Sequence, residues 1–214
     1  MAADDALTSL QHEVIELFFG LPESAGFVLA GGAGLVVAGL SSRPTDDVDF
    51  FGSDLDIGVV LAADALEAAC AGKGWRISRL QDALTFRRLQ VESGDHALLV
   101  DLAIYSPPLG QVHLTSLAPT FAPQELAARK VLALFDRAAA RDFADVHTLS
   151  KQFDVHMLID QAAELDGGFD LDVLVSMLGT IDRFTDDELA STGSDPESLR
   201  AFASELAERL RRSQ

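Results

Sequence analysis

The 214-residue sequence has a single cysteine and no long uninterrupted apolar run, and each scarcity excludes a class of protein. Cys70 cannot form an internal disulfide, which indicates a reducing compartment, and its largely apolar, helical surroundings predict a buried side chain. The longest apolar run, residues 27–40, is interrupted by glycines and is shorter than the roughly 20 residues that cross a bilayer. Residues 1–10 carry acid where a secretion signal carries base. We therefore expect a cytoplasmic protein without a membrane span.

Basic residues are also scarce, because 16 lysines and arginines stand against 34 acidic residues, for a net charge of −18. Proteins bind nucleic acids largely by neutralising phosphates with Lys and Arg, so this charge argues against a duplex-DNA partner. A local basic cleft remains compatible with the total. Two groups of basic residues lie close together in the sequence, namely Arg129, Lys130, Arg137 and Arg141, and then Arg209, Arg211 and Arg212.

Two common catalytic constellations are missing from the sequence. The five histidines show no metal-ligand spacing with one another or with Cys70, which argues against a zinc site. No serine lies in a nucleophile-elbow pattern, which argues against a hydrolase triad. The chemistry is therefore to be sought among the acidic residues.

Apolar periodicity predicts strands and helices in the first half of the chain and helices alone in the second. The predicted helices of the first half are residues 5–20, 33–40 and 55–72, the last at least from residue 61, and the predicted strands are residues 26–32, 47–51, 75–81 and 83–105, the last with an internal turn. From residue 123 the pattern is helical, with breaks at 167–168 and 191–198. We therefore predict an α+β protein, with an α/β domain at residues 1–120 and a helical domain at 121–214.

Two Asp-x-Asp pairs, at residues 47–49 and 54–56, lie in an otherwise largely apolar stretch. Alternate residues of a strand point to the same face, so the carboxylates of Asp47 and Asp49 are expected to converge. Like charges that close repel each other unless a cation lies between them. Because Mg²⁺ typically binds one or two carboxylates together with substrate phosphates, the strand at 47–51 predicts a magnesium site.

Two further features bear on this site. Asp101 is the only charged residue of the apolar segment 97–105, and an isolated buried carboxylate is costly unless it is paired or binds metal. Metal binding or catalysis is one interpretation of Asp101, and a polar residue at a strand edge is the other. Gly31 and Gly32 close a strand and open a helix, where a phosphate can approach backbone N–H groups, although a simple tight turn also explains them.

Two segments resemble one family. Residues 26–51 resemble the first motif of the nucleotidyltransferase superfamily in the form carried by AbiEii/AbiGii-type toxins, in which a glycine turn and a helix precede an Arg-x-Thr-x-Asp-x-Asp run. Arg43, Thr45, Asp47 and Asp49 match that run. Residues 125–149 resemble the family's second region, which has a lysine on a helix and then an Arg-Asp-x-x-Asp run. Two positions depart from the pattern, because Ala33 replaces a usual Thr or Ser and Ser42 replaces a frequent His.

The resemblance implies a nucleotidyltransferase-like small mixed sheet with flanking helices, followed by a C-terminal helical bundle that completes the active-site cleft. It also implies Mg²⁺-dependent transfer of a nucleotidyl group from an NTP to an acceptor hydroxyl. Asp47 and Asp49 would bind the metal, and Asp101 would be the third carboxylate, as metal ligand or base. The implied nucleotide-binding residues are Gly31, Gly32, Arg43, Thr45 and Lys130, of which Lys130 would contact the triphosphate.

The second motif also assigns a role to Asp142, which would orient Lys130 or the nucleotide. Arg141 and Asp145 are spaced i, i+4, so an ion pair on the helix surface explains them equally well.

The same fold requirement separates the two Asp-x-Asp pairs. The family needs a helix between the glycine turn and the acidic strand, but Gly52 and Ser53 directly precede Asp54 and leave no room for one. Asp54 also lies farther beyond Gly32 than one short helix and a linker require. We therefore take Asp47 and Asp49 as the metal pair and expect Asp54 and Asp56 in a solvated connection.

By resemblance, the protein is expected to be a toxin of an AbiE-type toxin–antitoxin system that modifies RNA, such as tRNA, or a protein, and that a cognate antitoxin neutralises. One alternative is a nucleotidyltransferase for small molecules such as aminoglycosides, because an acidic surface concentrates cations. The other is a degenerate module that binds an NTP without turnover. Neither duplex DNA nor a membrane is an expected partner.

Overall fold

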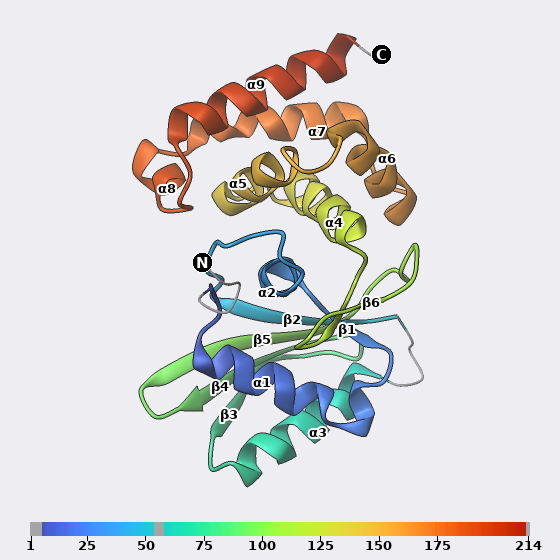
Figure 1. Ribbon diagram of the computed structural model, residues 1–214, viewed down its shortest axis with the longest axis vertical. Coiled ribbons are helices and arrows are strands. Elements are labelled where there is room, and N and C mark those ends of the chain that lie inside the picture. Colours follow the sequence, from blue (N-terminus) through green and yellow to red (C-terminus); the bar gives the residue numbers. More distant parts are fainter. Residues whose placement is uncertain (1–5, 54–57, 213–214) are drawn as a thin grey trace. The chain divides into compact units, whose positions relative to one another are not determined.

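The computed structural model describes residues 6–53 and 58–212. Within these residues, a seven-stranded sheet organises the first half of the chain (Figure 1). The strand order is β3-β4-β5-β2-β1-β7-β6. The sheet is mixed, since β2 runs parallel to β5 and antiparallel to β1, which confirms the predicted class. The strands are β1 (Phe27–Ala30), β2 (Asp47–Gly52), β3 (Arg76–Asp82), β4 (Phe86–Ser93), β5 (His96–Ile104), β6 (His113–Leu114) and β7 (Pro119–Thr120).

Helices cover the two faces of this sheet differently (Figure 1). Helices α1 (Ser9–Phe19) and α3 (Val59–Gly72) lie on one face, and the short α2 (Gly31–Val37) lies on the other. Val48 and Phe50 of β2 are fully buried, and the ring of Phe18 from α1 stacks on Phe50 with ring centroids 4.0 Å apart. Because side chains alternate along a strand, Asp47 and Asp49 point to the opposite face, where α2 lies.

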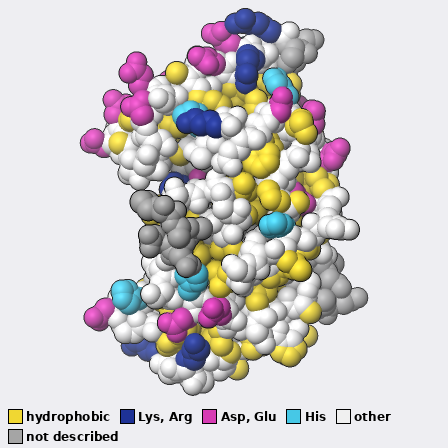
Figure 2. Space-filling view, viewed as in Figure 1, with side chains coloured by type: hydrophobic (Ala, Val, Ile, Leu, Met, Phe, Trp, Pro, Cys, Tyr) yellow, Lys and Arg dark blue, Asp and Glu magenta, His cyan; other side chains and the backbone are white. Residues whose placement is uncertain are grey.

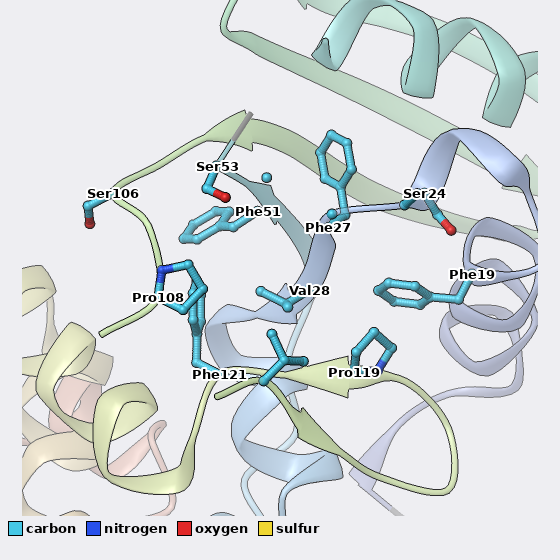
Figure 3. Close-up of a pocket in the computed structure, with 14 residues that line it drawn as sticks. Phe19, Ser24, Phe27, Val28, Phe51, Ser53, Ser106, Pro108, Pro119 and Phe121 are labelled. Atoms are coloured by element: carbon cyan, nitrogen blue, oxygen red, sulfur yellow. The ribbon is translucent and has the colours of Figure 1, made fainter. Parts of the chain in front are cut away.

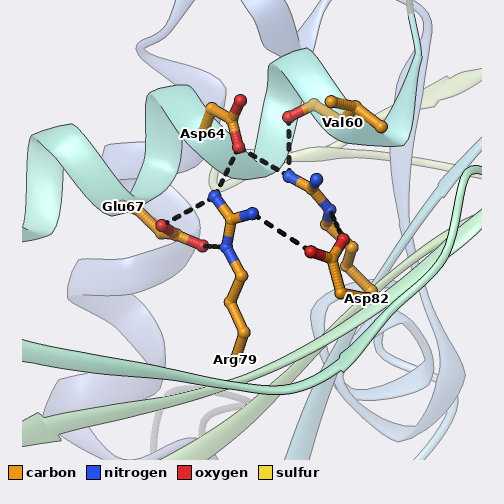
Figure 4. A network of polar contacts seen from close by, with 6 residues as sticks. Val60, Asp64, Glu67, Arg79 and Asp82 are labelled. Atoms are coloured by element: carbon orange, nitrogen blue, oxygen red, sulfur yellow. Dashed lines mark hydrogen bonds and ion pairs between the residues drawn. The ribbon is translucent and has the colours of Figure 1, made fainter.

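A polar network holds α3 against the edge of the sheet (Figure 4). The guanidinium of Arg87, whose side chain is 6% exposed, donates to carboxylates of Asp64 and Asp82 and to the backbone oxygen of Val60. Arg79 donates to Asp64, Asp82 and Glu67. The hydrogen bond from Arg87 is the main reason that the pKa of Asp64 is lowered. Cys70, on the same helix, is fully buried as predicted, and burial raises its pKa to about 11.

The chain divides into two compact units, residues 1–126 and 127–214. Helix α4 crosses this division. In the second unit α5, α7 and α8 pack against the long α9, whose apolar stripe contains Leu199, Ala203 and Leu206. The remaining helices are α4 (Pro123–Asp136), α5 (Ala140–Leu149), α6 (Val155–Leu165), α7 (Leu171–Leu178), α8 (Asp186–Ala190) and α9 (Pro196–Arg212), with short 3₁₀ helices η2 (Pro22–Ser24) and η3 (Gly179–Arg183).

Several boundaries differ from the sequence prediction. The units divide after residue 126 rather than after residue 120, because α4 starts in the first unit. A break at residues 137–139 separates α4 from α5, and the two-residue strands β6 and β7 are too short to give an apolar alternation. Helix α3 starts at Val59 despite the branched pair there. The predicted solvated pair Asp54 and Asp56 lies outside the described residues.

Helices in the described ranges are all too short or too polar to cross a membrane.

Candidate active site

The register between β2 and β5 places two of the predicted aspartates side by side. Asp49 is the direct neighbour of Asp101 across this parallel pair. Side chains at aligned positions of neighbouring strands share a face, and Asp47 shares that face two residues before Asp49. The structure therefore brings Asp47, Asp49 and Asp101 to the sheet face opposite α1 and α3.

Gly31 and Gly32 fit closely against this acidic strand. Gly31 has a φ of +59°, and a Cβ atom there would lie 1.7 Å from Oδ2 of Asp49. A Cβ atom at Gly32 would lie 2.5 Å from Oγ1 of Thr45. A side chain at either glycine would therefore displace Asp49 or Thr45 from the start of α2, in addition to any effect on phosphate binding.

The loop before β2 is anchored from α1. Thr45 Oγ1 donates to Oδ1 of Asp47 at 2.9 Å, and the backbone oxygen of Thr45 accepts from Nε2 of Gln11 at 2.7 Å. Gln11 is 1% exposed and also forms a capping box with Thr8 at the start of α1. Sequence reasoning missed Gln11, although the Thr-x-x-Gln spacing before an apolar run is a known signal of a helix start. Arg43, in the same loop, donates to the backbone oxygen of Pro44.

Asp101 is bound by an arginine that the sequence analysis did not single out. Arg88 on β4 is the direct neighbour of Asp101, and it donates from Nε to Oδ1 at 2.8 Å and from Nη2 to Oδ2 at 2.6 Å. These hydrogen bonds are the main cause of a raised Arg88 pKa, and the charges of Asp47 and Asp49 raise it further. Arg88 thus lies in the electrostatic field of all three aspartates.

The three aspartates do not form a ready-made metal cage. Within the part of the chain that the structure describes, no three His, Cys, Asp or Glu side chains lie close enough to hold an ion together. Asp47 and Asp49 share a face of one strand, whereas the carboxylate of Asp101 is engaged by Arg88. The expected gathering of three carboxylates around one site is therefore realised only in part.

Lys130 is held by a different aspartate from the predicted one. Its Nζ lies 2.8 Å from Oδ2 of Asp145 on α5, and the two side chains are 9% and 2% exposed. Asp142 accepts instead from Nε and Nη2 of Arg137, both at 2.9 Å, and from the backbone N–H of Ala139. The contact with Lys130 therefore belongs to Asp145, and the other predicted role of the fully buried Asp142, orienting the nucleotide, stays a prediction. Asp142 fixes the turn between α4 and α5, and Asp145 orients Lys130.

A separate pocket of about 480 Å³ opens at the other end of β1 and β2 (Figure 3). Val28, Phe51, Pro119 and Phe121 are among the side chains that point into it. None of the described residues that line it is charged, so it is not the predicted nucleotide site.

Comparison with known proteins decides the family. The model of the family described as nucleotidyl transferase AbiEii toxin of a type IV toxin–antitoxin system matches residues 19–212. The chain belongs to the AbiEii family. The match spans both motifs that carried the resemblance and extends over both compact units.

Solved structures share the AbiEii fold of this chain. JHP933 from Helicobacter pylori is 20% identical, with 97% of this chain and 96% of that chain covered and a TM-score of 0.56. MenT4, a nucleotidyltransferase toxin from Mycobacterium tuberculosis H37Rv, is 15% identical, with 94% and 85% covered and a TM-score of 0.54. None of the curated protein sequences matches significantly.

Membership of the AbiEii family makes this chain a nucleotidyltransferase of the toxin type. A type IV toxin–antitoxin family also implies an NTP substrate and a cognate antitoxin.

Proposed function

We propose that the chain is a Mg²⁺-dependent toxin that transfers a nucleotidyl group from an NTP to a hydroxyl group of RNA, such as tRNA, or of a protein. The observation that carries this proposal is the placement of Asp47 and Asp49 on one sheet face, against the glycines that open α2 and in register with Asp101. A buried lysine, Lys130, is available in the second unit.

The donor set of β2 fits magnesium. Mg²⁺ binds oxygen ligands and commonly takes only one or two carboxylates together with substrate phosphates and water, and Asp47 and Asp49 supply two carboxylates from one strand. When bound, the ion would offset the negative charge of the triphosphate. Thr45, which donates to Asp47, would fix the orientation of that carboxylate.

The remaining roles follow from charge and position. Backbone N–H groups at Gly31 and Gly32 would approach the phosphates. Arg43 would lie near the phosphates, and the ammonium group of Lys130 would contact the triphosphate. In the transfer, the oxygen of the acceptor hydroxyl attacks the α-phosphorus and the bond to pyrophosphate breaks. Asp101 would serve the acceptor hydroxyl either as a ligand of the metal or as the base that takes its proton.

Labelled NTPs incubated with Mg²⁺, total cellular RNA and the purified protein would test the proposal. We expect label in RNA or in protein with the wild type, and loss of label with Asp49→Ala or with a chelator. The matched control is Glu92→Gln on β4, which changes an acidic residue that pairs with Arg76 on the same sheet. Undiminished transfer by Asp49→Ala would exclude the proposed metal site.

A small-molecule acceptor is the second candidate, favoured by the net charge of −18. Acidic side chains lie mainly along the margins of the face seen in Figure 2, and a surface with an acidic excess attracts cationic acceptors more readily than RNA. A panel of aminoglycosides in the same assay separates the two, because transfer to the panel without transfer to RNA or protein would replace the first proposal.

A further inference from the structure

Arg88 and Asp101 form a bidentate ion pair inside the proposed site. The strands β4 and β5 place them directly opposite each other, and both oxygens of the carboxylate accept from the guanidinium, at 2.8 Å and 2.6 Å. The Asp101 side chain is 10% exposed and the Arg88 side chain 40%. Paired hydrogen bonds of this kind fix both the position and the plane of a carboxylate.

The location of Arg88 gives this pair a second effect. Asp49 is the neighbour of Asp101 on the other side, and Asp47 lies on the same face. Neighbouring carboxylates repel one another in the absence of a cation, and Arg88 supplies one positive charge that interacts with all three. A divalent ion bound directly to Asp101 would have to lie beside the guanidinium, which is unfavourable for two cations.

We propose that Arg88 is a positioning residue that keeps Asp101 off the metal and directed at the acceptor hydroxyl, while Asp47 and Asp49 hold the divalent ion. The inference rests on the proposed function and narrows it, because it assigns Asp101 to the acceptor side of the reaction. It agrees with the finding that, among the described residues, no three acidic, histidine or cysteine side chains are placed to share an ion.

Binding of Mn²⁺ by the full chain without nucleotide, measured by titration calorimetry, tests the charge argument. We expect Arg88→Gln to bind Mn²⁺ about tenfold more tightly, because it frees a third carboxylate and removes a positive charge. Asp49→Asn should weaken binding at least about tenfold, whereas Asp101→Asn should change it less than about threefold. Adding Asp101→Asn to Arg88→Gln should restore the wild-type affinity. Arg76→Gln is the matched control, because Arg76 pairs with Glu92, and should leave affinity unchanged.

Transfer kinetics test the positioning argument. Arg88→Lys keeps the positive charge but cannot bond both oxygens in one plane, so we expect near-normal Mn²⁺ affinity, an unchanged KM for the NTP and a kcat lowered about tenfold or more. Thermal unfolding of each variant, compared with that of the wild type, identifies any variant that has lost the fold. The kinetics of Arg88→Lys are then compared with those of the wild type only if the variant is folded.

Two results would overturn the inference. One is that Asp101→Asn weakens Mn²⁺ binding as much as Asp49→Asn, since Asp101 would then be a metal ligand. The other is that folded Arg88→Gln and Arg88→Lys match the wild type in both Mn²⁺ affinity and kcat. A wild type that neither binds Mn²⁺ nor transfers a nucleotidyl group would instead defeat the proposed function itself.

Discussion

A Cβ atom at Gly31 would lie 1.7 Å from Oδ2 of Asp49, so any larger residue there would displace this carboxylate from its place beside the start of α2. The relationship joins the glycine turn and the acidic strand, which the sequence presents as separate features, into one packed unit.

Gly31→Ala should therefore abolish transfer and destabilise the first unit. The matched control is Gly39→Ala, because Gly39 also has a positive φ of +73° but has no atom within 4 Å of an added Cβ. Backbone strain alone should cost about 1–2 kcal/mol in either variant, and the clash should add to it only at Gly31. Urea unfolding and the labelled-NTP assay measure the two effects. Equal stability and equal activity of the two variants would contradict the packing argument.

Asp145→Ala should destabilise the second unit by about 3–5 kcal/mol, because it removes the carboxylate that balances the buried ammonium of Lys130. Glu208→Ala is the control, since Glu208 and Arg212 form a well-exposed pair on α9 and such pairs contribute about 0–1 kcal/mol. Replacing Lys130 and Asp145 together by Met and Leu should recover most of the stability without recovering transfer. Chemical denaturation provides the measurement, and a similar cost for both single variants would refute the assignment.

Gln11→Ala should lower both stability and kcat, because it removes a buried hydrogen bond to Thr45 and one half of the α1 capping box. We expect a cost of about 1–3 kcal/mol, since the carbonyl of Thr45 loses its buried donor. Glu188→Ala breaks the equivalent box at α8, away from β2, and should cost about 1 kcal/mol with no change in kcat. An unchanged kcat in Gln11→Ala would show that the anchor does not position the loop.

The stability of the second unit should depend on the protonation of His147. Burial, with a smaller effect of Lys151, lowers the pKa of His147 below its ordinary 6.5. Between the ordinary pKa and the lowered one, the folded state therefore binds fewer protons than the unfolded state. The contribution of neutral His147 to the free energy of unfolding is fully present above pH 6.5 and is lost as the pH drops through the lowered pKa. His147→Gln should flatten this part of the curve. Urea midpoints at pH 7.5 and 5.5 provide the check, and the prediction fails if wild type and variant lose equal stability.

The sequence predicted those parts of the site that depend on local geometry. The shared face of Asp47 and Asp49 follows from the two-residue period of a strand, and the glycine turn follows from the change of period after Ala30. The fold class could also be predicted from the sequence, because apolar alternation ends near residue 120 and helical periodicity replaces it.

The pairing of side chains from different helices and strands could not be predicted from the sequence in this way. Asp142 and Asp145 lie on one helix, three residues apart, and only the packing of α4 on α5 selects Asp145 as the partner of Lys130. Arg87 and Arg88 are adjacent in sequence, yet one pairs with α3 and the other with Asp101. The sequence alternation separates their faces but does not say which face carries the aspartates.

The sequence by itself determined that this protein is an α+β member of a nucleotidyltransferase family with an acidic pair on a strand after a glycine turn. Tertiary structure alone decided that Asp101 is the neighbour of Asp49 and is held by Arg88, and that Asp145 holds Lys130. The physical reason is that periodicity and turn chemistry act over a few neighbouring residues, whereas strand register and helix packing are set by the burial of the whole core.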